Sequence, residues 1–273
     1  ASKLSTDQVT ALTTAQVAAF ETADLAKLST DAVVSLSTAQ LHVLSTDQIS
    51  SMTSAQTAAL TSDQVGSLTT PQLAALLAGT QMSTMTTAQV ASLTTSQVVA
   101  LTTKQASELS STQLAAMSTS QVKALEVEDL AKISTAAISA LSSAQTANLT
   151  TAQVVALTTA QAGQLSASAL AGFSSAQVAA LDTADLAKLS TDAIQSISTA
   201  ALVGLSAATQ VGKLTTDQVV ALTTAQVNAL STAQVAALST AQVSKLSSDQ
   251  LAVMTTSQIA SIETADVAAL TTS

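Results

Sequence analysis

Residues 230–237 read Leu-Ser-Thr-Ala-Gln-Val-Ala-Ala, and variants of this octad follow one another along the chain. We number the large apolar residue as position 1, which places Ser or Thr at position 2, Gln at position 5 and Val, Leu or Ile at position 6. Position 1 can be followed from Leu4 to Leu270. A tandem repeat of this kind indicates a single continuous octapeptide-repeat solenoid over residues 1–273.

The octad keeps its phase except at two places, near 74–82 and near 205–211, where one extra residue is inserted. The position 1 residues are eight apart up to Leu76, resume at Met85 after a gap of nine, and are again nine apart at Leu205 and Leu214. The sequence after each insertion returns to the same pattern. We therefore interpret each insertion as a bulged corner rather than as a kink or a docking point.

Neither a β-strand nor a long α-helix can satisfy the octad. Positions 1 and 6 differ by an odd number, so strand alternation would place the two apolar side chains on opposite faces. The chain has only six glycines and one proline, too few for a β-solenoid rich in tight turns. In one continuous helix, eight residues turn by about 800°, so the apolar stripe would rotate by about 80° in every octad.

A short helix that restarts in every octad does fit. Ser or Thr at position 2 followed by Gln at position 5 is a capping box, and positions 1 and 6 are the pair that forms a hydrophobic staple. Pro71 falls in the second helical position, where its missing N–H is harmless. Aspartates fall in the same position, where the helix dipole favours an anion; they are Asp7, Asp31, Asp47, Asp63, Asp192, Asp217 and Asp249.

Helices this short are marginal alone and must stack. We predict an all-α repeat solenoid with one capped helix of about six residues per octad, an extended corner residue and three or four octads per coil. Positions 1 and 6 are expected to point inward, the alanines at positions 7 and 8 to allow close packing, and positions 4 and 5 to face water. The handedness of the superhelix is left open.

Composition excludes several classes of function. The chain has no cysteine, which removes disulfides, Cys-ligated zinc, iron–sulfur clusters and thiol catalysis. Its net charge is −9 and its basic residues are eight lysines without arginine, so nucleic acid is not an expected partner. Polar residues interrupt every apolar stretch, so no membrane insertion is expected. The first residues lack an apolar signal-peptide core, and we expect a segment of something longer.

The sequence offers no set of side chains for catalysis. His42 is the only histidine and stands at position 7, where we interpret it as a surface or partly buried replacement for Ala. Serines and threonines are needed as caps, and Phe20 and Phe173 occupy position 1 as core residues. We therefore predict no enzyme, no catalytic, cofactor-binding or metal-binding residues, and no cofactor.

The densest acidic cluster is residues 126–129, Glu-Val-Glu-Asp. It lacks the glycine and the alternating carboxylates of a calcium loop. Asp129 precedes Lys132 by three residues, a spacing at which helical side chains of opposite charge meet. We interpret the cluster as a solvated first turn in which Asp129 pairs with Lys132, and not as a cation site.

Two classes of function remain. A spacer or display scaffold needs only regular caps and a rod of defined length. A binding module would use the repeated Ser/Thr/Gln surface, for carbohydrate or for another copy of the chain; ice binding by threonine ladders is a less favoured version. A membrane-surface helix would need a broad basic face that is missing here. Residue types at position 4 and position 8 vary between octads, which favours the spacer.

The octads at residues 222–229 and 238–245 resemble the LTTAQVAA-type repeat tracts of very large bacterial secreted or surface proteins, including adhesin-like and hemolysin-type proteins. The resemblance covers essentially the whole chain. It implies an extracellular or cell-surface location, and neighbouring repeats or domains of a larger parent chain as partners. It supplies no site residues. Because an open solenoid exposes its core at the terminal coils, end-to-end self-association is also expected.

Overall fold

The structure is a computed structural model that describes residues 4–78 and 82–270. The chain forms two compact units, Ala1–Ala137 and Ile138–Ser273. Throughout the described residues, the regular structure consists of short helices of three to seven residues, and no strand is present there. The predicted all-α repeat fold of very short helices is confirmed.

The helices of the first unit follow one another at octad spacing. They are α1 (Thr6–Thr10), α2 (Thr14–Ala18), α3 (Thr22–Leu25), α4 (Thr30–Val34), α5 (Thr38–His42), α6 (Thr46–Ser50), α7 (Ser54–Ala59), α8 (Ser62–Ser67), α9 (Thr70–Leu76), the 3₁₀ helix η1 (Met82–Thr84), α10 (Thr87–Ala91), α11 (Thr95–Val99), α12 (Thr103–Ser107), α13 (Ser111–Ala116), α14 (Thr119–Ala124) and α15 (Val127–Leu130). The division between the units falls within α16 (Thr135–Ile138).

The second unit repeats the same arrangement. Its helices are α17 (Ser143–Ala147), α18 (Thr151–Ala156), α19 (Thr159–Ala162), α20 (Ala167–Leu170), α21 (Ser175–Ala180), α22 (Thr183–Lys188), α23 (Thr191–Ser196), α24 (Thr199–Leu202), the 3₁₀ helix η2 (Val211–Lys213), α25 (Thr216–Ala221), α26 (Thr224–Ala229), α27 (Thr232–Ala236), α28 (Thr240–Val243), α29 (Ser248–Ala252), α30 (Thr256–Ala260) and α31 (Thr264–Leu270).

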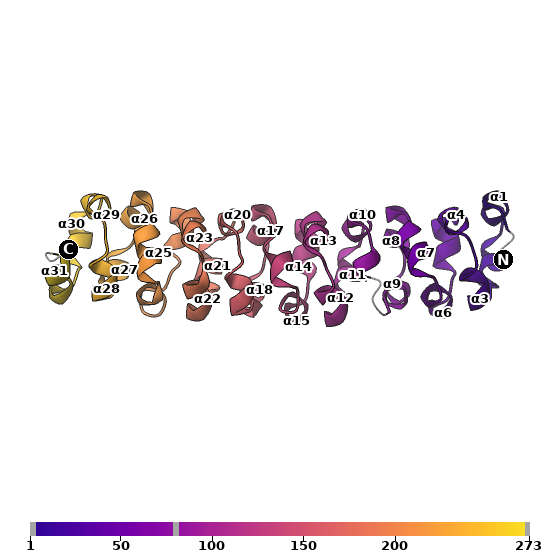
Figure 1. Cartoon of the computed structure of the whole chain (residues 1–273), viewed down its shortest axis with the longest axis horizontal. Helices are drawn as coiled ribbons and strands as arrows, with labels where there is room; N and C mark the ends of the chain where they lie inside the picture. The colour runs from indigo at the N-terminus through magenta and orange to yellow at the C-terminus, as the bar shows by residue number, and fades with distance from the viewer. Residues whose placement is uncertain (1–3, 79–81, 271–273) are drawn as a thin grey trace. The chain divides into compact units, whose positions relative to one another are not determined.

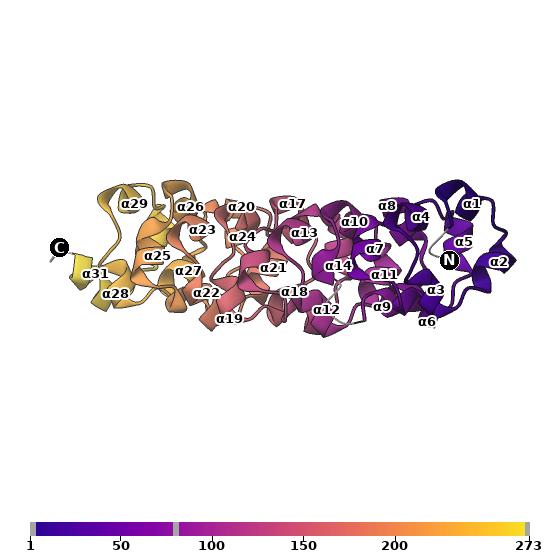
Figure 2. The ribbon, with the colours of Figure 1, turned by 45° about the vertical axis from the view of Figure 1, so that its right-hand side comes forward.

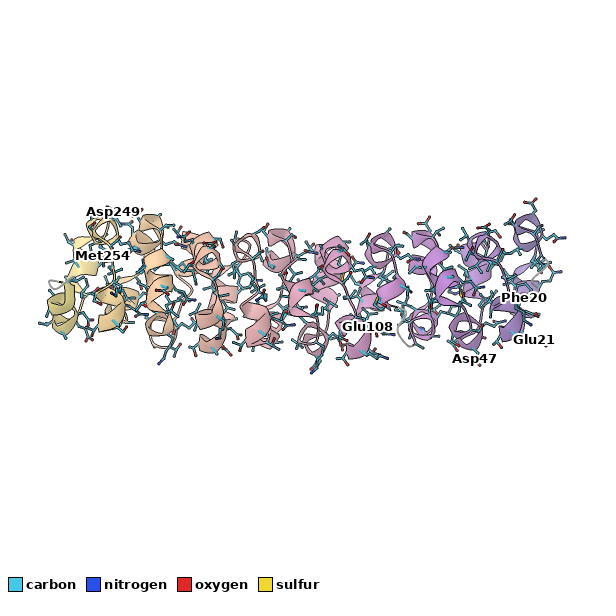
Figure 3. The ribbon with its side chains drawn as sticks, in the orientation of Figure 1. Phe20, Glu21, Asp47, Glu108, Asp249 and Met254 are labelled. Atoms are coloured by element: carbon cyan, nitrogen blue, oxygen red, sulfur yellow. The ribbon has the colours of Figure 1, made fainter. Side chains whose placement is uncertain are left out.

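The capping box predicted from the octad forms in most of the described helices, although α3 and α15 have no side-chain cap hydrogen bond. At α10, the backbone N–H of Thr86 donates to Oε1 of Gln89 over 2.7 Å, and the N–H of Gln89 donates to the Thr86 hydroxyl over 3.2 Å. Thr86 is extended, with φ −71° and ψ 160°. Asp47 and Asp249 lie in the first turns of α6 and α29 and point away from the core (Figure 3). The extended cap turns the corner without a left-handed residue, as expected.

Three octads make one coil. In the first unit, α4 packs on α7, α5 on α8 and α6 on α9 (Figure 1). In the second unit, α17, α20 and α23 follow one another in a row (Figure 2). Within each unit, a helix therefore packs on the third helix before it, which selects the lower of the two predicted numbers of octads per coil.

The core consists of the residues at positions 1 and 6. In octads 85–92 and 93–100, Val90 and Val98 are completely buried and Leu93 is 4% exposed. Residues at positions 7 and 8 of neighbouring coils also contact each other. For example, Nδ2 of Asn228 at position 7 donates to the carbonyl of Val253 at position 8 over 2.6 Å.

The extra residues do not form the expected bulged corners. At the first insertion, the carbonyl of Leu77 accepts a hydrogen bond from Nε2 of Gln105, as a position 1 carbonyl does in other octads. The extra residue therefore lengthens α9. Residues 79–81 of this region lie outside the described residues. At the second insertion, the N–H of Ser206 donates to Oε1 of Gln210, four residues on instead of three, over 2.7 Å. A helical turn absorbs one residue more easily than a two-residue corner that fixes the register.

Candidate functional site

Position 5, which is glutamine in most octads, forms the main polar site of the repeat. In α14, Oε1 of Gln121 accepts the N–H of Ser118 over 2.6 Å and so completes the capping box. Nε2 of the same amide donates to the carbonyls of Leu93 over 2.7 Å and Val90 over 3.1 Å, which belong to the coil below. One side chain thus caps its own helix and joins two coils. We call this arrangement the glutamine link.

The expectation that position 5 faces water is wrong. Gln121 is only 3% exposed, and Gln89 and Gln234 are each 1% exposed. The capping box correctly predicted what Oε1 does, but it says nothing about Nε2, whose partners are about thirty residues away in sequence. The chemical signal was the residue type itself, because Gln has an amide donor that Glu, the other capping-box residue, lacks.

The glutamine link fixes the register between coils. Where no residue is inserted, Nε2 donates to a position 6 carbonyl 31 residues earlier and to a position 1 carbonyl 28 residues earlier. Gln258, for example, donates to Val227 and Leu230. Across the second insertion the spans become 32 and 29, as for Gln226 with Ile194 and Ile197. The same contacts are kept with one more residue between them. The insertions therefore leave the stacking of the coils unchanged.

Asp129 replaces glutamine at position 5 in α15 and is buried. Its side chain is 2% exposed, and Oδ2 has no hydrogen-bond partner. Burial, together with the nearby charges of Glu126 and Glu128, raises the pKa of Asp129 from 3.8 to about 6. The prediction of a solvated carboxylate that pairs with Lys132 is therefore wrong, because position 5 points between coils and not outward.

Asp185 in α22 is a second buried aspartate that replaces glutamine at position 5. It is 2% exposed, and its Oδ1 lacks a hydrogen-bond partner. Burial raises the pKa of Asp185; a hydrogen bond from the Thr159 side chain opposes this, and the nearby charge of Asp182 adds to it. Asp182 accepts the N–H of Asp185 over 2.7 Å as the helix cap. The cap of α22 is therefore kept by Asp182, whereas α15, which contains Asp129, has no side-chain cap hydrogen bond. Both aspartates place a carboxyl where the amide donor belongs.

Replacing Asp129 by glutamine is expected to raise the free energy of unfolding by about 1–3 kcal/mol near pH 7.5, because it removes a buried acceptor without a partner. The pKa of Asp129 is higher in the folded protein than in the unfolded chain. Asp129 therefore destabilises the wild type least below about pH 4, and the stability of the wild type falls as the pH rises through about 6. Urea unfolding of both proteins over this range measures the difference.

The matched control is Asp63→Asn, which removes an exposed carboxylate from the first turn of α8 in the same unit. This change should not increase stability at any pH, because the helix dipole favours an anion there. Equal stability of the wild type and Asp129→Gln at neutral pH would contradict the assignment of Asp129 as a strained replacement for the glutamine link.

An open depression of about 240 Å³ lies in the first unit and is lined by Thr103, Lys104, Ser107 and Lys132. Both lysines are exposed, and no acidic side chain lines it. The Ser107 hydroxyl in this lining donates to the carbonyl of Lys104 in the same helix over 2.6 Å.

The remaining side chains that the sequence singled out lie apart from one another. His42 is exposed at the end of α5. Phe173 is a core residue with 3% exposure, whereas Phe20 is partly exposed. Over residues 4–78 and 82–270, no three His, Asp or Glu side chains lie close enough to hold a metal ion. None of the helices described is both long and apolar enough to cross a bilayer.

The ALTTAQ repeat is the family whose model matches this chain, in residues 17–54, 122–159, 178–216 and 231–261. These four stretches make up more than half of the sequence. No curated protein matches the chain. The six letters of the family description appear at residues 221–226 and run from position 8 of one octad to position 5 of the next. They include the corner, the cap and the glutamine link, and the chain belongs to the ALTTAQ repeat family.

Proposed function

We propose that this structural repeat region is not an enzyme and acts as an elongated spacer or display scaffold within a larger bacterial surface or secreted protein. The glutamine link is the observation that carries the proposal. Because each coil makes the same hydrogen bonds with the next, coils can be added without any new kind of contact. Nearest-neighbour contacts of this type suit a part whose length matters more than any single side chain.

The distribution of variation within the chain supports the same function. The buried positions 1, 5 and 6 repeat nearly the same residues, whereas exposed positions differ. Position 4 carries Asp217, Ala225 and Ala233 in three successive octads, and all three side chains are exposed. A surface that recognises a repeated ligand would require one residue type at one exposed position. The variation therefore favours a spacer over a binding module.

In the alternative function as a binding module, few hydroxyl and amide groups remain free to contact a ligand. The hydroxyls at position 2 accept helix N–H groups, as Thr223 does from Gln226 over 3.2 Å. From Gln40 onward the described amides at position 5 are buried, so the Ser/Thr/Gln surface imagined for carbohydrate or ice reduces there to position 3. There Ser and Thr alternate, for example Thr240 and Ser248 in neighbouring octads.

We further propose that residues 1–273 form one continuous solenoid. The octad keeps its phase from Ile133 through Leu141 to Leu149, across the division between the units, without an inserted residue. The resemblance to bacterial surface tracts supports an extracellular or cell-surface location. The expected partners are neighbouring repeats or domains of a larger chain.

Small-angle X-ray scattering on the dilute chain tests the spacer. With three octads per coil and layers about 8–10 Å apart, the expected length is roughly 90–110 Å and the expected radius of gyration roughly 27–33 Å. A compact globule of this size would have a radius of gyration of about 19 Å. A value near the compact one would contradict both the single solenoid and the spacer.

A deletion of residues 230–253, three complete octads, provides the control. It should shorten the particle by about 8–10 Å and keep cooperative unfolding, because the coils on either side can link to each other. A deletion of residues 230–241 removes one and a half octads and should lower stability, because it leaves a broken octad at the junction. Similar behaviour of the two variants would contradict the octad as the unit of length.

A further inference from the structure

Three successive octads of the second unit lack glutamine at position 5. They are residues 181–188, 189–196 and 197–204, which together make one coil, and they carry Asp185, Ala193 and Ala201 at this position. In every other run of three complete octads, at least one position 5 glutamine is present. We call the contact between the coil of residues 181–204 and the coil of residues 157–180 below it the unlinked junction.

The unlinked junction places no glutamine amide opposite the carbonyls of the coil below. Elsewhere in this unit the amide reaches the position 1 carbonyl 28 residues earlier, as Gln177 reaches Leu149 over 2.8 Å. At the unlinked junction the corresponding carbonyls are those of Leu157, Leu165 and Phe173. Neither an alanine methyl group nor a carboxylate can donate a hydrogen bond to them. The glutamine link is therefore missing from all three octads of this coil.

The next junction, between residues 181–204 and the coil of residues 205–229, is fully linked. Each of the three octads of the upper coil donates through its own glutamine. The bonds run from Gln210 to the carbonyl of Leu181 over 2.6 Å, from Gln218 to that of Leu189 over 2.8 Å and from Gln226 to that of Ile197 over 2.8 Å. The coil of residues 181–204 is thus joined to the coil above it by hydrogen bonds that it does not make with the coil below.

Apolar packing holds the unlinked junction together. Across it α22 packs on α19, α23 on α20 and α24 on α21 (Figure 1). Leu186 and Ile194 at position 6 are completely buried. At Gly204 an added Cβ would overlap the carbonyl oxygen of Ser175, so the two coils approach closely there. Close nonpolar contact therefore takes the place of the amide bonds.

Opening the unlinked junction would hydrate polar groups that the closed stack leaves unsatisfied. Asp185 is 2% exposed and its Oδ1 has no hydrogen-bond partner, although the Thr159 side chain hydrogen-bonds to its carboxyl across the junction. A buried acceptor without a partner raises the free energy of the closed state, and water satisfies it on opening. At a fully linked junction, opening instead breaks three glutamine links. The unlinked junction therefore resists opening less than the junction above it.

We propose that the second unit opens first at the unlinked junction, which is a built-in break in the stack between residues 157–180 and residues 181–204. The helices that face the break are four to six residues long, and helices this short are marginal without a stacking partner. A stack under tension can therefore lengthen at one place while other coils stay folded. This goes beyond the proposed spacer, which requires only that the coils stack.

Hydrogen–deuterium exchange of the full wild-type chain, followed by mass spectrometry in low concentrations of urea, tests the break directly. Amides of residues 157–204 should exchange together, at least about tenfold faster than those of residues 214–237, whose coils are fully linked. Both regions consist of short helices of the same repeat, so local helix length does not explain a difference. Equal protection of the two regions would overturn the proposal.

Asp185→Gln restores an amide donor opposite the Leu157 carbonyl. It should slow exchange in residues 157–204 about tenfold and leave residues 214–237 unchanged. Asp192→Asn is the matched control, because Asp192 is an exposed carboxylate in the first turn of α23 in the same coil. The control should exchange like the wild type. The same effect from both variants, or no effect from Asp185→Gln, would contradict the assignment.

An engineered disulfide gives the sharpest readout, because the chain has no cysteine of its own. An added Cβ at Gly163 would lie 3.4 Å from Cβ of Lys188 across the unlinked junction, close to the roughly 3.5–4.5 Å of a disulfide. In Gly163→Cys/Lys188→Cys, oxidation should slow exchange of residues 157–204 at least about tenfold relative to the reduced form of the same protein. Circular dichroism confirms that both forms are folded.

Unchanged exchange on oxidation would overturn the break. Small-angle scattering of the wild type tests the spacer independently. An elongated particle without early opening would leave the spacer and remove the break. Early opening in a compact particle would do the reverse.

Discussion

Replacement of Gln121 by alanine is expected to lower the free energy of unfolding by about 2–4 kcal/mol, among the largest effects of any single substitution in the chain. The change removes the Oε1 acceptor for the Ser118 N–H and the Nε2 donor to the Leu93 and Val90 carbonyls. The Leu93 carbonyl would remain buried without its donor, and a cavity would form between the coils. Urea unfolding of the dilute chain measures the loss.

Gln16→Ala is the matched control for this prediction. Gln16 makes the same capping box, with the Thr13 N–H donating to Oε1 over 2.8 Å, but it lies in the first coil and is exposed. Its loss should cost about 1 kcal/mol or less, the usual contribution of a helix cap. The difference between the two variants isolates the bonds that join coils. Equal losses would mean that the link between coils contributes nothing.

Replacement of Gly172 by alanine is expected to lower stability by about 1–3 kcal/mol. Gly172 stands at position 8, where an added Cβ would overlap the carbonyl oxygen of Ser143 in α17 and lie 2.8 Å from the Thr146 hydroxyl. The Thr146 hydroxyl is itself held by the carbonyl of Ala169 over 2.6 Å, so α17 and α20 cannot separate without losing this bond. Thermal unfolding compares the variant with the wild type.

Gly163→Ala is the corresponding control. At Gly163 an added Cβ would lie 3.4 Å from Cβ of Lys188, an ordinary contact, and the residue has a helical backbone with φ −64° and ψ −13°. Alanine should therefore increase stability by about 0.4–1 kcal/mol, because it restricts the unfolded chain. If both variants had the same effect, the close approach at Gly172 would not limit the packing of the coils.

Glutamine and aspartate do not play equivalent roles at position 5. Glutamine satisfies the cap and the coil below at once, while Asp129 and Asp185 are buried with one oxygen each unpartnered. Position 5 also departs from glutamine at five alanines, which are Ala32, Ala137, Ala169, Ala193 and Ala201. We expect the two buried aspartates to lower the stability of their own coils.

The local part of the fold was predictable from residue spacing. The box from position 2 to position 5, the staple from position 1 to position 6 and the place of Pro71 depend on atoms within one helical turn. The family of very short helices follows from them. The number of octads per coil was predicted only as a range, because it depends on how helices from different octads fit against one another, as α4 fits α7.

Only part of the candidate site could be predicted, because the rest depends on contacts between different octads. The sequence identified Gln at position 5 as a capping residue but placed it in water, and it placed Asp129 in water beside Lys132. Both errors concern what lies beyond the helix itself. Nothing local to Gln121 indicates that the carbonyl of Leu93 stands within 2.7 Å of its Nε2.

By itself, the sequence determined the octad, the capped helices, the inward direction of positions 1 and 6 and the absence of cysteine chemistry, since each depends on composition or on contacts within eight residues. Tertiary structure alone decided that three octads make a coil, that the position 5 amide is buried and that inserted residues enter helical turns. The physical reason is that hydrogen bonds such as those from Gln258 join atoms 28 and 31 residues apart. Only the stacking of coils brings such atoms together.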